Sequence, residues 1–418
     1  MVSVWKNRDF TWLFTGQTIS QFGAAISNFA IPWLLLELTG SAVQMGFAFA
    51  VGFIPYLLVS LPAGVWADKY DRKKLMMIAD IGRLLLLSSI PLFYFIFDIH
   101  IIQLYLVQAG ISLFSALFDA AYGACLPNVV EKKQLQQANS VLQAGTSLSQ
   151  IIGPALGGGL VGLFGVPETI IISGVSYLVS AVTLLKIKKH MKTENIAGAD
   201  KQDMFMQIKE GLQYVWNNKL IRLTGIYATF LNFVIFASIV AIMYKVKEEL
   251  GLDAAAAGIM TASFSLGSVI GSVINGKVNK YLSGKNLIVT ILMLQIIPPL
   301  LIGFSDNVAT IAVANGIGGV LLTIWNIQII TLRQSLIPDE LMGRATTSIR
   351  LIAWCSIPLG NSIGGVLAGS YGTTSVFVID SLVRFTLLAI SIPLLFQGKR
   401  KRDYDFSLLE NNRVQQGG

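Results

Sequence analysis

Residues 64–74 read GVWADKYDRKK and separate two apolar runs, at about 45–66 and 75–97. Each run is long enough for an α-helix to cross a hydrocarbon core of ~30 Å at about 1.5 Å per residue. The stretch between them is dense in charge and includes Asp68 and Arg72. Charge alone leaves two interpretations open: a basic turn that only orients the hairpin, or a loop that holds another helix end through ion pairs and helix-dipole contacts. Under both, two spanning helices meet at a short charged loop.

The composition extends this prediction to the whole chain. Of its 418 residues, 54% are hydrophobic and only 13% are charged, whereas a soluble domain carries about 25% charged residues. Apolar runs of spanning length lie at about 10–36, 45–66, 75–97, 101–124, 141–165, 167–185, 220–243, 255–275, 285–304, 308–332, 346–371 and 374–397. The sequence therefore predicts an all-α integral membrane protein with twelve transmembrane helices.

The distribution of basic residues predicts the orientation. An even number of spans places both termini on one side, and Lys and Arg mark the cytoplasmic side. With the N-terminus inside, the outer loops contain only Lys245 and Lys247 of the 31 Lys and Arg residues. We therefore expect a multi-pass protein with both termini in the cytoplasm. The same bias accounts for the net charge of +8 without nucleic acid as a partner.

The longest polar stretch divides the twelve runs into two sets of six. The predicted parts are an N-terminal six-helix bundle (1–185), a cytoplasmic linker with an interfacial helix (186–219), a C-terminal six-helix bundle (220–397) and a disordered cytoplasmic tail (398–418). The interfacial helix is expected from an apolar stripe at helical spacing, formed by Met204, Ile208, Leu212 and Val215.

The two halves also repeat weakly. Five glycines recur at one constant offset: Gly153, Gly157, Gly158, Gly162 and Gly165 return as Gly360, Gly364, Gly365, Gly369 and Gly372. Parallel six-helix repeats around a site near the bilayer midplane are typical of secondary transporters.

Residues 64–74 resemble the signature loop of the major facilitator superfamily, which lies between the second and third helices. The matching positions are Gly64, Ala67, Asp68, Lys69, Arg72 and Lys73. Asp71 stands where Gly is common. The resemblance covers about residues 10–397 and implies two six-helix bundles joined by a latch at this loop.

The fifth helix adds a second motif. Gly153-Pro154 followed by Gly157-Gly158 is similar to the motif of the superfamily's drug/proton antiporters. Physically, Gly153 and Gly157 form a small-residue face for a close partner helix, and Pro154 removes a backbone hydrogen bond. Ordinary helix packing is the alternative explanation.

Several stretches resemble the macrolide-efflux branch and related enterobactin-type exporters: GQTIS (16–20), TGSAV (39–43), GFIPYLLVSLPAGVWADKYDRKK (52–74) and KEGLQYVWNNK (209–219). This resemblance implies an exporter of the bacterial cytoplasmic membrane that is coupled to the proton gradient and works by alternating access.

The resemblance also implies contacts of the latch. In the family, the loop arginine pairs with an acid at the inner end of the fourth helix, which gives Arg72–Asp119 here. Asp68 is then expected to face the start of the eleventh helix near Gly343 and Arg344, where a helix N-terminus attracts an anion.

Charged residues inside the spans are functional candidates, since each costs at least ~2.5–3.5 kcal/mol at the bilayer centre. Asp80 and Arg83 share a helix face, and so do Asp380 and Arg384. Each pair is interpreted either as a self-neutralising structural pair or as part of the proton pathway. Many drug antiporters carry an arginine in the fourth helix, and this chain has none there. The proton carrier is therefore left open among Glu37, Asp80 and Asp380.

The family's substrate cavity is lined by the first, fourth, seventh and tenth helices. Candidates there are the amides and aromatic residues Gln17, Gln21, Asn28, Asn232, Phe236, Asn315, Trp325 and Asn326. Neutral amides with aromatic rings suit a bulky amphiphilic compound, whereas a sugar phosphate would need convergent Arg or Lys. Buried hydrogen bonding between helices is the alternative.

Together these features predict a monomeric secondary transporter that exports drugs such as macrolides in exchange for protons. The alternatives are a transporter of a natural metabolite, such as a siderophore-like solute, and a lipid-translocating protein without ion coupling. No catalytic constellation and no His/Cys metal site is visible in the sequence. We therefore expect no enzyme, metal or cofactor, with the proton gradient as the driving force.

Overall fold

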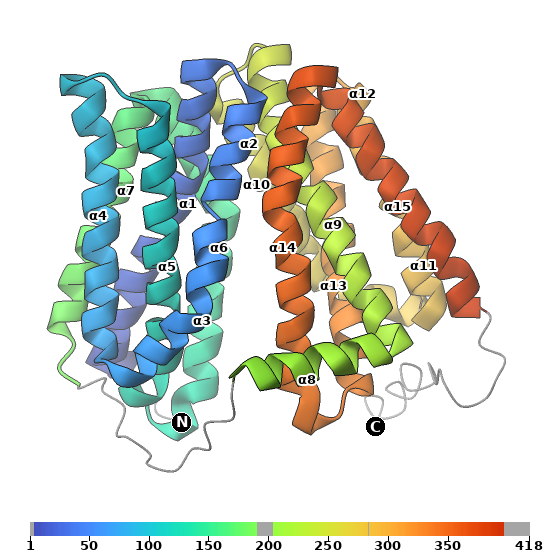
Figure 1. Cartoon of the computed structure of the whole chain (residues 1–418), viewed down its shortest axis with the longest axis horizontal. Helices are drawn as coiled ribbons and strands as arrows, with labels where there is room; N and C mark the ends of the chain where they lie inside the picture. The colour runs from blue at the N-terminus through green and yellow to red at the C-terminus, as the bar shows by residue number, and fades with distance from the viewer. Residues whose placement is uncertain (1–3, 190–203, 283, 397–418) are drawn as a thin grey trace. The chain divides into compact units, whose positions relative to one another are not determined.

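The computed structural model describes residues 4–189, 204–282 and 284–396 (Figure 1). These residues form α-helices joined by short turns, and they contain no β-strand. The predicted tail (398–418) and most of the first part of the predicted linker lie outside the described residues.

The chain divides into two compact units. Unit 1 comprises Met1–Ala199 and Met243–Ala262, and unit 2 comprises Asp200–Ile242 and Ser263–Gly418.

The helices of unit 1 follow the sequence order closely. They are α1 (Arg8–Thr39), α2 (Ala42–Val51), α3 (Ile54–Lys69), α4 (Arg72–Ile96), α5 (Ile101–Val129), α6 (Leu135–Phe164) and α7 (Val166–Lys186), with the π-helical turn η3 (Lys245–Glu249) and the start of α10 (Ala254–Tyr281).

Unit 2 contains the rest of α10 and most of α9. Its helices are α8 (Met204–Asn217), α9 (Lys219–Tyr244), α11 (Gly284–Leu294), α12 (Ile297–Phe304), α13 (Val308–Leu336), α14 (Asp339–Tyr371) and α15 (Thr373–Phe396). The short helix α8 runs across one end of α14 and packs against it (Figure 1).

The described residues contain twelve helical stretches that are long and apolar enough to span a membrane, which confirms the predicted number. Two of the twelve are interrupted. The second consists of α2 and α3, which break at Gly52 and Phe53. The ninth consists of α11 and α12, which break at Gln295 and Ile296. Both breaks precede a proline near the start of the next helix, where the missing N–H costs least.

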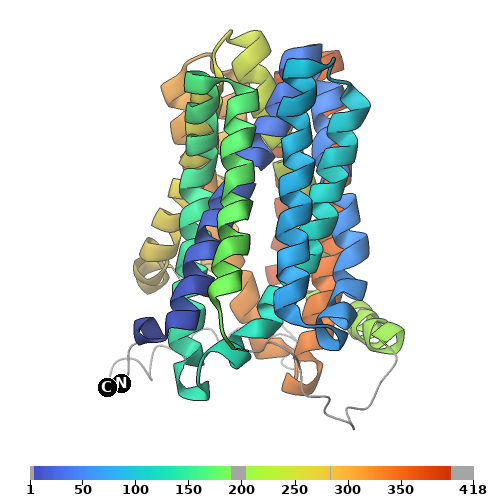
Figure 2. The same cartoon turned by 90° about the vertical axis from the view of Figure 1, so that its left-hand side faces the viewer.

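Small side chains set the packing inside unit 1. A Cβ on Gly23 of α1 would lie 3.0 Å from the Ser173 carbonyl oxygen of α7, so only glycine allows this approach. The Ser173 hydroxyl donates to the Gly23 carbonyl oxygen at 2.6 Å. Figure 2 shows α7 (green) and α4 (light blue) side by side on the face turned toward the viewer. Close approach and hydrogen bonds of this kind hold helices together where lipid removes the hydrophobic driving force.

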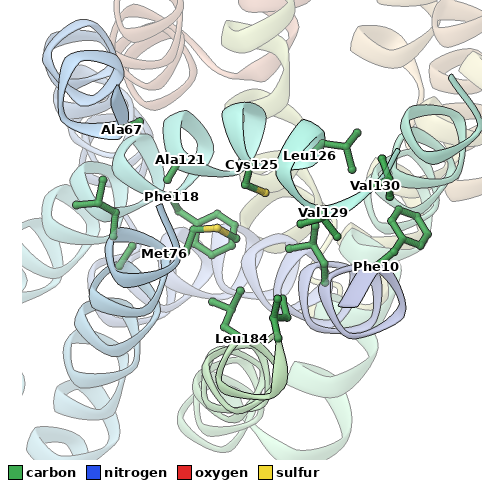
Figure 3. Close-up of a cluster of buried hydrophobic side chains, with 14 of the residues drawn as sticks. Phe10, Ala67, Met76, Phe118, Ala121, Cys125, Leu126, Val129, Val130 and Leu184 are labelled. Atoms are coloured by element: carbon green, nitrogen blue, oxygen red, sulfur yellow. The ribbon is translucent and has the colours of Figure 1, made fainter. Parts of the chain in front are cut away.

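One hydrophobic cluster lies where α1, α3, α4, α5 and α7 meet (Figure 3). Phe10, Met76, Phe118 and Leu184 are each at most 2% exposed. The cluster packs the first two turns of α4, which follow the signature loop, against the C-terminal half of α5, which carries Asp119.

The boundary of unit 1 differs from the sequence-based division, which placed Met243–Ala262 in the C-terminal bundle. The contact of α6 with α10 explains the difference. A Cβ on Gly158 would lie 2.8 Å from the Gly258 Cα atom, so these two glycines bring the backbones into contact.

Candidate functional site

Arg72 of the signature loop is bound at the end of α5. Its guanidinium donates to the Ala124 carbonyl oxygen (2.7 Å) and to the Asn128 side-chain oxygen (2.8 Å), and its Nε donates to the Ala67 carbonyl oxygen. It also lies 3.5 Å from a carboxylate oxygen of Asp68. The loop therefore ties α3, α4 and α5 together.

The predicted Arg72–Asp119 contact is wrong for this structure. Asp119 lies five residues before Ala124 on α5, about 7.5 Å further along the helix axis. Its carboxylate accepts a hydrogen bond from the Tyr56 hydroxyl of α3 at 3.0 Å and forms no ion pair within the described residues. The side chain is exposed at the surface of unit 1.

The predicted position of Gly343 and Arg344 at the start of a helix is also corrected. Helix α14 begins at Asp339, so these residues lie in its second turn, beyond the N-terminal positive end. Arg344 forms an ion pair with Glu210 of α8. A contact of Asp68 with this region would join residues of different units and stays a prediction.

The other loop residues have local roles. Asp71 is the N-cap of α4, since its side chain accepts from the Lys74 backbone N–H at 3.2 Å; this explains why an acid replaces glycine here. The Lys73 ammonium donates to the Ile187 carbonyl oxygen at 2.7 Å, just past the end of α7. A Cβ on Gly64 or on Gly343 would meet no atom within 4 Å, so neither glycine mediates a close approach within its own unit.

The pair of Asp80 and Arg83 is buried inside unit 1. Asp80 is 0% and Arg83 4% exposed, and their ion pair measures 2.5 Å. The guanidinium lies 4.6 Å from the ring centre of Phe118 and 4.3 Å from that of Tyr177, so it is stacked between two aromatic rings. The second Asp80 oxygen, Oδ2, has no hydrogen-bond partner among the described residues, although the Ser180 hydroxyl lies close to the carboxyl group.

The pair of Asp380 and Arg384 on α15 is bonded on every side. Arg384 donates to both carboxylate oxygens of Asp380, at 2.5 and 3.4 Å. The Ser238 hydroxyl of α9 adds a third hydrogen bond at 3.0 Å. Arg384 also donates at 3.2 Å to Gln295, which lies at the break between α11 and α12.

Glu37 lies in the last turn of α1 and is exposed. It accepts a hydrogen bond from the Trp33 indole at 2.7 Å, and the Lys247 ammonium lies over the same indole ring at 5.5 Å. These contacts indicate a residue of the membrane interface.

The glycines of the antiporter-type motif form the close contacts that the sequence predicts. A Cβ on Gly153 would lie 2.3 Å from the Ala25 Cβ of α1, and Gly157 approaches Ile26 of the same helix. The repeated glycines of unit 2 do the same, since Gly360 and Gly364 approach α9. Pro154 lies within α6. The two halves therefore use one packing face twice.

The amides predicted on α1 do not form one polar surface. Gln17 is 6% exposed, and Gln21 accepts from the Ser149 hydroxyl of α6 at 3.4 Å. Asn28 alone of the three is exposed. Two of the three therefore belong to helix packing.

The candidates in unit 2 divide in the same way. Asn232 donates to the Ala353 carbonyl oxygen of α14 at 3.1 Å, and Asn326 is exposed. Phe236 and Asn315 are half-buried. Trp325 is 5% exposed and lies 4.9 Å from Tyr227, ring centre to ring centre. The predicted neighbours Trp325 and Asn326 thus have different surroundings.

Some polar residues were missed because their partners are distant in sequence. Tyr56, Asn128, Ser238 and Gln295 all bind the charged candidates described above. Tyr56 and Asn128 each directly follow a proline, Pro55 and Pro127, and nothing in the local sequence indicates their partners.

Comparison with known proteins places this geometry in a family. The family model described as "Transmembrane secretion effector" matches residues 2–408. The chain is 25% identical over 396 residues to the multidrug efflux pump Tap of Mycolicibacterium fortuitum, covering 90% of each protein. It is 23% identical over 398 residues to macrolide efflux protein A of Streptococcus pyogenes, covering 94% of this chain and 96% of that protein.

The fold has solved counterparts. A bacterial homolog of the human lysosomal transporter Spinster, in an inward-facing and unoccupied conformation, superposes with a TM-score of 0.69 at 13% identity, and 99% of each chain is covered.

Proposed function

The chain belongs to the transmembrane secretion effector family of the major facilitator superfamily, and from this premise we propose that it exports drugs or other amphiphilic compounds in exchange for protons. It is a multi-pass membrane transporter, not an enzyme. The names of its relatives Tap and macrolide efflux protein A support the direction of transport and the substrate class. The proposed driving force is the proton gradient across the cell membrane, with a monomer as the working unit.

The observation that carries the proposal is the state of Asp119. It is an exposed carboxylate within a spanning helix, and the Tyr56 hydroxyl is its only hydrogen-bond donor among the described residues. A carboxylate without a cation at membrane depth is costly and marks an ion pathway. Such a group binds either a proton or a cationic substrate, and the two exclude each other. Exchange at one carboxylate is the chemistry that antiport requires.

A route from Asp119 to the helix core supports coupling. Phe118 is the next residue on α5, and its ring lies against the Arg83 guanidinium. The positive charge of Arg83 acts on Asp119 electrostatically. A change in the charge of Asp119 therefore changes the field at the buried Asp80–Arg83 pair, which joins α4 to α5 and α7.

The other acids fit the exchange less well. Asp380 is saturated by Arg384 and Ser238, and Asp80 is buried against Arg83. Glu37 lies at the interface. We therefore place proton exchange at Asp119 and give Asp80 and Arg83 the role of sensing its charge.

Asp68 keeps its proposed role in the latch. Its side chain is 74% exposed even though Arg72 lies 3.5 Å away, so the carboxylate can also accept a partner from another part of the chain. The proposed partner region is the second turn of α14 around Gly343 and Arg344.

The test is export from drug-sensitive cells of a macrolide and of a fluorescent organic cation. Asp119→Asn should abolish export of the cation and Asp119→Glu should retain part of it, because only a titratable group can exchange a proton. A protonophore should abolish export by the unchanged protein. Asp98→Asn, which removes an exposed acid from the turn after α4, is the matched control and should export normally.

Normal export of the cation by Asp119→Asn, with protein confirmed in the membrane, would refute the assignment. Insensitivity to the protonophore would refute proton coupling. A lack of export of every compound by the unchanged protein would favour a natural metabolite as the substrate.

A further inference from the structure

Unit 2 contains an apolar pocket of about 130 Å³ between α9, α11, α13 and α15. It is separate from Asp119 and its neighbours, which belong to unit 1. Trp325 and Leu332 of α13 form a buried wall and are 5% exposed each. The volume is below the ~300–1,000 Å³ typical of pockets for drug-sized ligands. The pocket therefore suits a single slender apolar chain.

The pocket opens at the surface of unit 2. Its rim residues Ile226 and Phe230 of α9 are 38% and 48% exposed, and Ile390 of α15 is 49% exposed. All three helices that form the rim and the buried wall belong to stretches that can span a membrane. An occupant with an apolar chain can therefore enter directly from the bilayer.

Two basic residues stand at one end of the opening. Lys219 and Arg222 lie in the first turn of α9, at i and i+3, and Ile226 and Phe230 continue the same helix face at i+7 and i+11. Arg222 donates to the Trp216 carbonyl oxygen at 2.9 Å and lies over the Trp216 ring at 5.5 Å. Trp216 is 63% exposed, as is typical of a residue at a membrane interface.

The same stripe of α9 thus changes from cationic to apolar over about 17 Å, the axial rise from Lys219 to Phe230. This arrangement is complementary to a phospholipid, which has a phosphate at one end and an acyl chain at the other. Clusters of Lys and Arg beside a spanning helix favour anionic lipids over zwitterionic ones. By the sequence-based orientation, the basic end faces the cytoplasm.

A buried donor lies between the two ends. Tyr227 is 7% exposed and lines the pocket, and its hydroxyl makes no hydrogen bond to a described residue, although Ser391 lies close to it. Ser391 uses its own hydroxyl to donate to the Leu387 carbonyl oxygen at 2.8 Å. This donation leaves the lone pairs of the Ser391 oxygen free, so that oxygen is a nearby acceptor for the Tyr227 hydroxyl. An ester oxygen of a lipid in the pocket would be an alternative acceptor for the same hydroxyl.

We propose that this pocket binds one acyl chain of an anionic phospholipid, with the phosphate held by Lys219 and Arg222. The lipid is a resident ligand of unit 2 and not the exported substrate. The proposal does not depend on proton exchange at Asp119.

The test uses the full-length protein in nanodiscs and phospholipids brominated on the acyl chain, which quench a nearby tryptophan. The difference in fluorescence quenching between the unchanged protein and Trp325→Phe gives the part of the quenching that comes from Trp325. Brominated phosphatidylglycerol should produce this part of the quenching at a concentration about tenfold lower than brominated phosphatidylcholine.

The double variant Lys219→Gln/Arg222→Gln should lose the preference for phosphatidylglycerol and keep its fold. The control double variant Lys277→Gln/Lys280→Gln removes two exposed cations from the end of α10 and should retain the preference. Absence of quenching at Trp325 would overturn the proposal, and so would equal quenching by both lipids. Displacement of the lipid by a transported cation at equal concentration would assign the pocket to substrate and would also overturn it.

Discussion

Among the described residues, each unit contains one pair of an aspartate and an arginine within a spanning helix, and the two pairs are built differently. Asp380 of unit 2 receives hydrogen bonds on both oxygens, from Arg384 and from Ser238. Asp80 of unit 1 receives one short hydrogen bond from Arg83, and its second oxygen has no well-aligned hydrogen bond among the described residues, although the Ser180 hydroxyl lies close to the carboxyl group. Arg384 is bonded to an amide, whereas Arg83 is stacked between aromatic rings.

The difference separates a structural pair from a responsive one. The charges of a fully hydrogen-bonded pair are compensated by their direct neighbours, so a change of charge elsewhere alters the energy of the pair little. An incompletely bonded pair at the same depth is sensitive to any nearby charge, since few hydrogen bonds fix it. The pair in unit 1 also has a neighbouring exposed carboxylate, Asp119, on which the charge of Arg83 acts.

Removal of the arginine should have the largest effect. Arg83→Gln leaves Asp80 buried without a cation, and we expect a loss of about 3–5 kcal/mol in the free energy of unfolding. The loss for Arg384→Gln should be smaller than that for Arg83→Gln by about 1.5–3 kcal/mol, because the hydrogen bond from Ser238 to the Asp380 carboxylate remains. Equilibrium unfolding in detergent measures both. Equal losses would show that the two pairs are energetically alike.

Removal of an aromatic ring should have an intermediate effect. Phe118→Leu takes one ring from the Arg83 guanidinium and should destabilise the protein by about 2 kcal/mol, the value of a desolvated cation–π contact. Phe385→Leu changes an exposed ring next to Arg384 and should lie within about 0.5 kcal/mol of the unchanged protein. A loss at Phe385 as large as that at Phe118 would remove the distinction between stacked and hydrogen-bonded arginines.

Removal of the third hydrogen bond in unit 2 should have the smallest effect. Ser238→Ala leaves Asp380 paired with Arg384, so we expect a loss of only about 1 kcal/mol and normal export. Ser272→Ala removes an exposed hydroxyl that bonds within its own helix and serves as the control. Impaired export by Ser238→Ala would indicate that the pair of unit 2 also takes part in transport.

The fold could be predicted from sequence because its determinants are local. Spanning helices are recognised by the length of an apolar run. The four-residue spacing of Gly153 and Gly157 can likewise be seen in the sequence, and it places both glycines on one face of a helix. The same spacing identified the packing face that recurs at Gly360 and Gly364. The pairs Asp80–Arg83 and Asp380–Arg384 were predicted for the same reason, since both partners lie within one helical turn.

The site could be predicted only where its contacts stay within one helix. Arg72 was assigned to Asp119, but the partners of Arg72 lie one turn and more further along α5, at Ala124 and Asn128. The order and direction of two helices do not determine how far one is shifted along its axis relative to the other. A shift of about 7.5 Å is enough to change which residues are in contact. Trp325 was placed in the cavity, yet its ring turns inward to Tyr227, because side-chain direction depends on the helix rotation that packing sets.

Unit 1 is discontinuous in the sequence, because it needs Met243–Ala262 in addition to Met1–Ala199. When a ribosome has translated residue 199, the segment with Gly258 that covers Gly158 does not yet exist. Roughly 60 more residues must be added, which takes several seconds at about 5–20 residues per second. During that interval the small-residue face around Gly158 is open to lipid or to an insertion chaperone. Folding of unit 1 can thus be completed only after residues 243–262, in the second half of the chain, have been synthesised.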